Sequence, residues 1–271
     1  MTGPEEYILR LLQADPIRRP VMRSIIRALQ LPPASNGLDV GCGIGLQTLL
    51  LAETVGPAGR ITGVDILPEL LCYADNLVVK AGLSERIKYQ EADMSRLPFA
   101  DATFDWVWSA DCIGYPAGEL QPLLKELMRV VRPGGSILLL AWSSQQVLPG
   151  YPLLEARLNA TCSSYLPFLQ GKSPDLHFMR ALNSFQEAGL EQVEARTFVG
   201  DIQAPLMVGQ RTALTSLFEM LWGQKQPECS LEDWKEYQRL CAPGSADFIL
   251  DLPGYYAFLT YTMLRGTLPG E

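Results

Sequence analysis

The chain has 271 residues, of which 48% are hydrophobic and 19% are charged, and its formal net charge at pH 7 is −8. A chain of this length and composition can bury one large core, or one core with an inserted lid. The negative charge disfavours a nucleic-acid partner, because contacts with phosphates depend on Lys and Arg side chains.

No apolar run reaches the length of about 20 residues that crossing a bilayer requires, and we read no signal peptide at the start of the chain. The six cysteines are scattered without C-x-x-C pairing. This spacing argues against a metal cage or a disulfide framework and for a reducing compartment. We therefore expect a cytoplasmic protein without a metal ion and without a membrane partner.

Three arginines spaced four residues apart predict a basic stripe along an N-terminal helix: Arg19, Arg23 and Arg27. One interpretation is a solvated helix face. The other is a surface that meets an anionic group of a substrate or partner. The sequence leaves both open.

A glycine-rich turn follows the first predicted strand. The run Gly41-Cys42-Gly43-Ile44-Gly45 separates this strand from a predicted helix over residues 46–54. Glycines are needed there because any Cβ would block the close approach of a ligand to the backbone. Asp65 falls at the carboxyl end of a second predicted strand, over residues 60–64, where a carboxylate can accept hydrogen bonds from both hydroxyls of a ribose. Together these features predict an adenosine-containing ligand at the edge of a parallel sheet.

Two common ligands of glycine-rich turns do not fit this pattern. A dinucleotide fingerprint would carry its third glycine at the position of Leu46. A triphosphate-binding loop would continue with Lys-Ser or Lys-Thr, and neither pair follows. An acidic residue, Asp39, lies instead inside the end of the first strand.

The segments up to residue 142 alternate between strand and helix patterns. A third strand is predicted from residue 87 toward the acid Asp93, and a fourth strand after a turn at residues 99–103. A helix over 119–131 and a Pro-Gly-Gly turn precede a fifth strand over 136–141. This alternation predicts right-handed βαβ units and a parallel sheet.

The second half of the chain has a different character. Residues 142–174 read as a long, aromatic, loop-rich connection, which is usually functional inside a compact domain. A helix over 176–188 and a strand over 191–198 are predicted next. A mainly helical insertion over about 200–252 and a last strand over 255–265 complete the chain. The Met and aromatic residues of the insertion form either plain core or an apolar acceptor pocket.

Taken as a set, these segments resemble motifs I to VI of the class I S-adenosylmethionine-dependent methyltransferases, in the branch that includes ubiquinone and menaquinone C-methyltransferases. The resemblance is close over residues 20–142 and holds only in outline elsewhere. It implies an α/β fold with a Rossmann-like seven-stranded mixed sheet, mostly parallel with the last strand antiparallel, flanked by helices. Residues 1–271 would form a single domain, with a cofactor-binding core at about 20–142 and lid or substrate insertions at about 143–175 and 200–252.

The same resemblance implies S-adenosylmethionine as cofactor. Asp65 would hold the ribose, Asp93 the adenine amino group, and Asp39 the amino group of the methionine portion, directly or through water. The other implied contacts come from the glycine turn, from two apolar residues beside the adenine and from the end of the fourth strand: Gly41, Cys42, Gly43, Gly45, Ile66, Met94, Ser109 and Ala110.

The acceptor side is less defined by the sequence. His177, the lone histidine, is a candidate general base because histidine titrates near neutrality. Asp111 and Tyr115 follow the fourth strand at the rim where ligands bind in open α/β sheets, although loop structure also explains them. We expect methyl transfer to a small, apolar or aromatic metabolite. The alternatives are a non-catalytic module that binds S-adenosylmethionine and a nicotinamide-dependent oxidoreductase.

Overall fold

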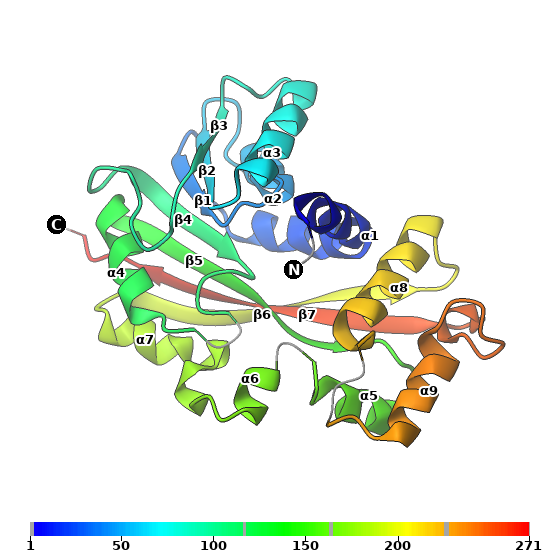
Figure 1. Cartoon of the computed structure of the whole chain (residues 1–271). Helices are drawn as coiled ribbons and strands as arrows, with labels where there is room; N and C mark the ends of the chain where they lie inside the picture. Colours follow the sequence, from blue (N-terminus) through cyan, green and yellow to red (C-terminus); the bar gives the residue numbers. More distant parts are fainter. Residues whose placement is uncertain (1–2, 116–117, 163–164, 225–227, 271) are drawn as a thin grey trace. The chain divides into compact units, whose positions relative to one another are not determined.

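The computed structural model describes residues 3–115, 118–162, 165–224 and 228–270. The small parts of the expected domain and of its insertions at 1–2, 116–117, 163–164, 225–227 and 271 lie outside the described residues. The strands are β1 Asn36–Val40, β2 Arg60–Asp65, β3 Ile87–Glu91, β4 Phe104–Ala110, β5 Val131–Gln146, β6 Glu191–Gln203 and β7 Tyr256–Thr267. The α-helices are α1 Pro4–Ala28, α2 Leu46–Thr54, α3 Pro68–Ala81, α4 Gln121–Val130, α5 Pro152–Asn159, α6 Leu166–Leu169, α7 Ala181–Glu187, α8 Val208–Trp222 and α9 Leu231–Cys241 (Figure 1). Short 3-10 turns lie at η1 Pro174–Leu176, η2 Phe178–Arg180 and η3 Ile249–Asp251.

The seven strands form one sheet in the order β3-β2-β1-β4-β5-β7-β6. β1 pairs in parallel with β2 and β4, and the pairs β2–β3 and β4–β5 are parallel as well. β7 runs the other way. Its Leu268 end bonds to Gly135, and Thr260 lies beside Ser143 further along β5. The mixed sheet with an antiparallel last strand confirms the fold class predicted from the sequence.

The order of the strands also fixes where a ligand can bind. After β1 the chain builds outward through β2 and β3, and then returns to place β4 on the other side of β1. In open sheets of this kind, ligands occupy the crevice at the carboxyl ends of the strands where the order reverses. The carboxyl ends of β1, β2 and β4 are therefore the place to look for the site.

The chain divides into two compact units, which we name by their residues. The core unit comprises residues 22–142, 175–198 and 262–271. The insertion unit comprises residues 1–21, 143–174 and 199–261. The interpretation of the insertions as a lid over a cofactor-binding core stays a prediction.

In the core unit, helices pack on both faces of the parallel strands. α4 and α7 lie on one face, and α2 and α3 lie on the other (Figure 1). Leu38 and Val40 of β1 are fully buried in a cluster with Leu124 of α4 and Phe185 of α7. Because successive side chains of a strand point to opposite faces, Asp39 lies on the opposite face, the one that α2 covers. This alternation puts a carboxyl group beneath the glycine turn.

In the insertion unit, aromatic side chains form a core of their own. Phe218 and Trp222 stack at 6.0 Å between ring centroids, and Tyr237 packs edge-on against Trp222 at 6.3 Å. All three are buried, whereas Met207 and Met220 are exposed. The core interpretation therefore holds for these three aromatic residues and not for the two methionines, while Trp234 is half-buried.

Several predicted segments differ from the structure. The third strand, predicted from residue 87 toward Asp93, ends at Glu91, and the strand predicted over 191–198 continues to Gln203. β5 begins at Val131 and runs to Gln146, so that the Pro-Gly-Gly turn is an irregularity within the strand. There the pairing with β4 jumps from Val131 to Ser136. The connection predicted as loop-rich contains α5 and α6.

Another difference concerns the predicted helix 176–188, of which only residues 181–187 are α-helical. His177 interrupts it with an extended backbone, φ −69° and ψ 131°, and its ring accepts a hydrogen bond from the backbone N–H of Met179. Such a local bond competes with the helical one.

Gly37 of β1 offers a direct test of the packing of the central strands. A Cβ at this position would lie 2.0 Å from Cζ2 of Trp106, a residue of β4 that is 1% exposed. The indole Nε1 donates to the Ser35 hydroxyl at 2.8 Å, so the ring is held in place. Gly37→Ala is expected to lower the free energy of unfolding by about 1–3 kcal/mol, because overpacking forces side chains and backbone to shift. Urea denaturation measures this difference.

Gly254→Ala is the matched control, since a Cβ there meets no atom within 4 Å. We expect it to change the free energy of unfolding by no more than about 0.5 kcal/mol. Equal unfolding curves for the two variants would contradict the packing of Trp106 on Gly37.

Candidate functional site

The glycine turn between β1 and α2 requires glycine for two separate reasons. Gly41, Gly43 and Gly45 have φ angles of 72°, 54° and 77°, in the left-handed region that side chains disfavour. A Cβ on Gly45 would lie 2.1 Å from the Tyr89 hydroxyl, and one on Gly41 would lie 2.6 Å from Sγ of Cys112. Tyr89 and Cys112 already fill the space beside the turn, so no side chain fits at Gly45 or Gly41.

Asp65 joins this turn to the next one along the sheet. Its Oδ2 accepts a hydrogen bond from the backbone N–H of Gly43 at 2.9 Å, and its Oδ1 accepts one from Leu67 at 3.1 Å. A carboxylate offers about four lone-pair positions, so both oxygens keep the capacity to accept from ribose hydroxyls. The next residue, Ile66, is 61% exposed, which is unusual for its type. An acceptor for a sugar thus lies beside an exposed apolar side chain.

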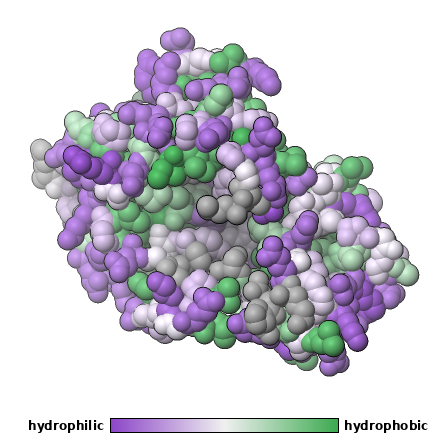
Figure 2. All heavy atoms as spheres, in the orientation of Figure 1, coloured by the Kyte–Doolittle hydropathy of each residue, from purple (hydrophilic) through white to green (hydrophobic). Residues whose placement is uncertain are grey.

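Hydrophilic residues cover much of the surface on the face drawn in Figure 2, with hydrophobic ones between them. Ile66 and Leu67 are among the large apolar residues that are exposed on the surface. None of the helices in the described part of the chain combines the length and the apolar character that crossing a membrane requires.

Asp39 lies on β1 just before the turn and is only 2% exposed. Its Oδ2 accepts a hydrogen bond from the Thr48 hydroxyl of α2 at 2.6 Å. Burial raises the pKa of Asp39 to about 7, the Thr48 bond opposes this shift, and the nearby charge of Asp65 adds to it. A buried carboxyl group therefore lies beneath the turn, and a positive charge would stabilise its ionised form.

Ser109 ends the row of buried residues on β4 and is 1% exposed. Among the described residues, its hydroxyl has no hydrogen-bond partner. Buried hydroxyls are nearly always paired, so this one calls for a ligand group or a water molecule. The glycine turn, the Asp65 carboxylate and this hydroxyl fit the polar groups of S-adenosylmethionine. No described group of three or more His, Cys, Asp or Glu residues is arranged to hold a metal ion.

Asp93 lies two residues beyond the end of β3, because that strand stops at Glu91. Its carboxylate accepts a hydrogen bond from the backbone N–H of Ser95 at 2.8 Å, and this bond lowers the pKa of Asp93. Side-chain bonds of this kind form a turn in place of a strand. Met94 is half-buried and packs against the core cluster. Asp93 is exposed and follows β3, the strand next to the one that carries Asp65.

The residues after β4 have internal partners. Asp111 adopts a left-handed φ of 54°, and its Oδ1 accepts a hydrogen bond from the backbone N–H of Trp142 at 2.7 Å. Tyr115 packs edge-on against Phe178 at 6.4 Å between ring centroids. These contacts give both residues a part in loop structure, while their contact with an acceptor stays a prediction.

His177 lines a cavity of about 310 Å³ in the core unit, between the segment before α4 and the segment before α7. Its Nδ1 accepts the Met179 N–H at 3.3 Å, and burial lowers its pKa. A neutral ring in this state carries its proton on Nε2. To act as a base at Nε2 it would have to move that proton and give up the Met179 bond. The role of His177 as a general base stays a prediction.

Two arginines of the basic stripe have acidic partners within the chain. Arg19 pairs with Asp15 at 2.8 Å, and Arg23 lies 3.4 Å from Glu53. All four side chains of these pairs are at least partly exposed. This arrangement favours the solvated helix face over an anion site for those two positions.

Sequence reasoning did not single out Thr48 and Tyr89, which lie beneath the turn. Thr48 comes from α2 and Tyr89 from β3, and only the fold brings them to Gly45 and Asp39. A Cβ on Gly45 or on Gly63 would clash with Tyr89, so these two glycines were the sequence feature that could have indicated a bulky side chain beneath the turn.

Comparisons with known proteins agree with this geometry. Residues 38–135 match the profile of the methyltransferase domain family. Over 198 residues the chain is 30% identical to a demethylmenaquinone methyltransferase of Bacillus cytotoxicus, an alignment that covers 67% of this chain and 81% of the relative.

Two solved structures show the same fold. An S-adenosylmethionine-dependent methyltransferase from Aquifex aeolicus is 22% identical with a TM-score of 0.54, over 73% of this chain and 92% of that one. Phosphoethanolamine N-methyltransferase 2 of Haemonchus contortus, in complex with S-adenosyl-L-methionine, is 17% identical with a TM-score of 0.51, over 88% of this chain and 50% of that one. The glycine turn and the strand order agree with what these relatives show. The chain belongs to the class I S-adenosylmethionine-dependent methyltransferases and uses S-adenosylmethionine as its cofactor.

Proposed function

We propose that this enzyme transfers the methyl group of S-adenosylmethionine to a small, apolar or aromatic metabolite. The bacterial relatives at 30–31% identity are named demethylmenaquinone methyltransferases, and a quinone ring is an acceptor of this class. The same proposal places the protein in the cytoplasm with a small-molecule partner rather than a nucleic acid or a membrane.

The observation that carries the proposal is the link between Asp65 and Gly43. It fixes the backbone of the turn next to the proposed acceptor for the ribose. S-adenosylmethionine supplies a methyl group activated by a sulfonium. An electron pair of the acceptor attacks the methyl carbon in line with the carbon–sulfur bond, whose electrons pass to sulfur. Because this displacement depends on alignment, the chief task of the protein is to hold both reactants in place.

In this proposal each named residue has one task. Asp65 binds the ribose hydroxyls, Asp93 the adenine amino group, and Asp39 stabilises the positive charge of the methionine portion. Ile66 and Met94 pack against the adenine. The remaining contacts are made by the turn and by the end of β4: Gly41, Cys42, Gly43, Gly45, Ser109 and Ala110.

The cavity beside His177 supports a small acceptor. Apolar and polar residues share its wall: Leu120, Leu176, Phe178, Glu119, Gln121 and His177. Such a mixture suits a ring with oxygen substituents, since most of a ligand pocket is apolar and a few polar groups fix the orientation.

The test is an assay with methyl-labelled S-adenosylmethionine and a panel of acceptors. The panel contains demethylmenaquinone with a short side chain, simple phenols, mixed-sequence DNA and transfer RNA. We expect label in an aromatic small molecule, detected by mass spectrometry, and none in the nucleic acids. The Asp65→Ala variant serves as the control for transfer that depends on the site.

Other outcomes separate the alternatives. Label in nucleic acid would contradict the acceptor class. Tight cofactor binding without transfer to the panel or to a metabolite extract would favour the non-catalytic module. The nicotinamide-dependent oxidoreductase finds no support among the relatives, and a lack of NADH binding is expected.

A further inference from the structure

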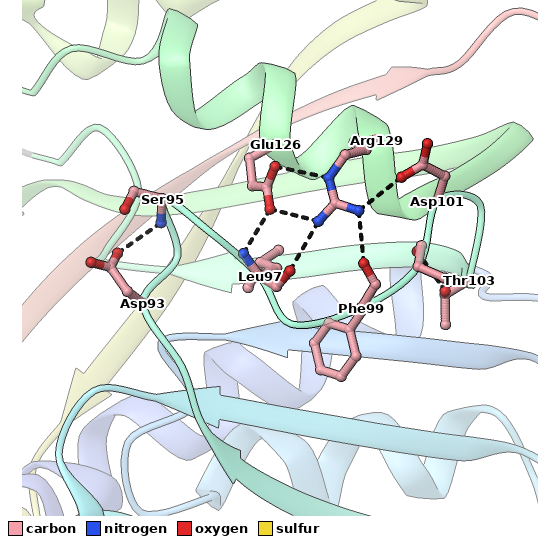
Figure 3. Close-up of polar contacts among 9 residues, drawn as sticks. Asp93, Ser95, Leu97, Phe99, Asp101, Thr103, Glu126 and Arg129 are labelled. Carbon is pink, nitrogen blue, oxygen red and sulfur yellow. Dashed lines mark hydrogen bonds and ion pairs between the residues drawn. The ribbon is translucent and has the colours of Figure 1, made fainter.

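The segment between β3 and β4 contains Asp93 and Met94 but has no regular secondary structure of its own up to Asp101. Within it, the carbonyl of Asp93 accepts a hydrogen bond from the backbone N–H of Arg96 at 3.0 Å. Beyond that turn, the backbone of Leu97 and Phe99 bonds to side chains of α4 (Figure 3). An element far away in sequence therefore fixes the position of this segment.

Two α4 residues one turn apart, Glu126 and Arg129, make these contacts. Oε1 of Glu126 accepts a hydrogen bond from the N–H of Leu97 at 2.6 Å, and Nη2 of Arg129 donates to the carbonyl of the same residue at 2.9 Å. Nη1 of Arg129 donates to the carbonyl of Phe99 at 2.7 Å. Leu97 is thus held at both its N–H and its carbonyl, with its side chain 3% exposed.

All five N–H donors of Arg129 have acceptors. Besides the two carbonyls, Nε and Nη2 donate to the two oxygens of Glu126 at 3.0 and 2.7 Å, and Nη1 donates to Asp101 at 2.9 Å (Figure 3). The Arg129 bond also lowers the pKa of Glu126, so the pair is charged at neutral pH. The planar guanidinium fits this set of acceptors, which the three donors of a lysine cannot all reach.

We infer that Glu126 and Arg129 are positioning residues for cofactor recognition, which they influence by fixing the segment that presents Asp93 and Met94 to the adenine. This inference rests on the proposed role of Asp93. It assigns to α4, which covers the opposite face of the sheet from α2 and α3, control over the selectivity of the enzyme for adenine. Neither residue touches the cofactor in this arrangement.

The experiment compares binding of S-adenosylhomocysteine and S-inosylhomocysteine, which has an oxygen in place of the adenine amino group, by titration calorimetry. The wild-type protein is expected to prefer the adenine ligand. Arg129→Met is expected to reduce that preference by about fivefold or more, because a mobile segment no longer holds the Asp93 carboxylate in place as an acceptor for the adenine amino group. A factor of ten in affinity corresponds to about 1.4 kcal/mol. Glu126→Gln is expected to act in the same direction and less strongly, and it serves as the second variant if Arg129→Met does not fold.

Arg132→Met is the matched control. Arg132 follows α4 at the start of β5 and pairs with an acid, Asp105, at 2.7 Å. Its other hydrogen bond goes to the carbonyl of Ala102, so both partners lie outside residues 93–101. Arg132→Met is expected to leave the ratio of the two affinities at its wild-type value. If Arg129 has a purely structural role, Arg129→Met will lower stability and leave that ratio unchanged. An unchanged ratio in both Arg129→Met and Glu126→Gln would overturn the inference.

Asp93→Ala separates this inference from the proposed function. If Asp93→Ala leaves the ratio unchanged, the proposed role of Asp93 is wrong, and the inference falls with it. If Asp93→Ala abolishes the preference while both α4 variants keep it, only the inference is wrong.

Discussion

Asp65→Ala is expected to weaken binding of S-adenosylhomocysteine by about 1–3 kcal/mol, which is the usual cost of leaving buried hydroxyls without a charged acceptor. In our proposal the side chain contributes to binding in two ways. The remaining lone pairs of its carboxylate accept hydrogen bonds from the ribose, and its Oδ2 accepts the hydrogen bond from the N–H of Gly43 at 2.9 Å. Removal of the carboxylate therefore takes away an acceptor and loosens the turn.

Titration calorimetry at neutral pH measures this loss. Glu91→Ala is the matched control, because Glu91 is an exposed acid at the end of β3, paired in register with Asp65. We expect the control to bind like the wild type. Equal affinities for wild type and Asp65→Ala would exclude Asp65 as the ribose acceptor.

The affinity for S-adenosylmethionine is expected to rise as the pH increases from 6 to 8. The pKa of Asp39 is about 7, so in the protein without ligand this carboxyl group loses its proton across that range. The sulfonium and ammonium charges favour the ionised form, so binding below pH 7 must release a proton. The affinity then changes by at most about tenfold per pH unit. S-adenosylhomocysteine lacks the sulfonium and should depend less on pH.

The stability of the unliganded protein should change with pH in the opposite sense. The folded-state pKa of Asp39 lies above its unfolded value of 3.8, so the protonated form is favoured by folding. The share of stability due to Asp39 is full below about pH 4, and it is lost as the pH rises to about 7. A shift of this size corresponds to roughly 4 kcal/mol as an order of magnitude.

Asp39→Asn tests both effects. The amide oxygen can still accept the Thr48 bond, which measures 2.6 Å in the wild type, but the group no longer titrates. The variant should bind S-adenosylmethionine with less dependence on pH and gain stability relative to the wild type at pH 8. Parallel pH profiles for the two proteins, measured by calorimetry and by urea denaturation, would show that another group is responsible.

Local patterns predicted the elements around the glycine turn well. The helix expected over 46–54 has those bounds in the structure, and Asp65 ends β2 as expected. Both follow from residues close together in the chain: left-handed glycines before the helix and an alternation of buried residues in the strand. The positions of Gly41, Gly43 and Gly45 follow from the same short stretch.

Features that depend on distant partners could not be predicted in this way. β5 continues to Gln146 because β7 pairs with it, and the sequence after Ala141 contains polar residues that gave no strand signal. The five bonds of Arg129 involve residues 28 to 32 positions earlier as well as its helix neighbour. His177 broke a predicted helix because its ring bonds to the backbone of Met179, a choice that periodicity does not reveal.

A crystal structure of the protein with S-adenosylhomocysteine tests the central claim most directly. We predict that the ribose hydroxyls lie within hydrogen-bond distance of the Asp65 carboxylate, with the backbone of residues 41–45 against the ligand and the adenine next to Asp93 and Met94. A nucleoside bound elsewhere, with Asp65 and the glycine turn free of contact, would contradict the account.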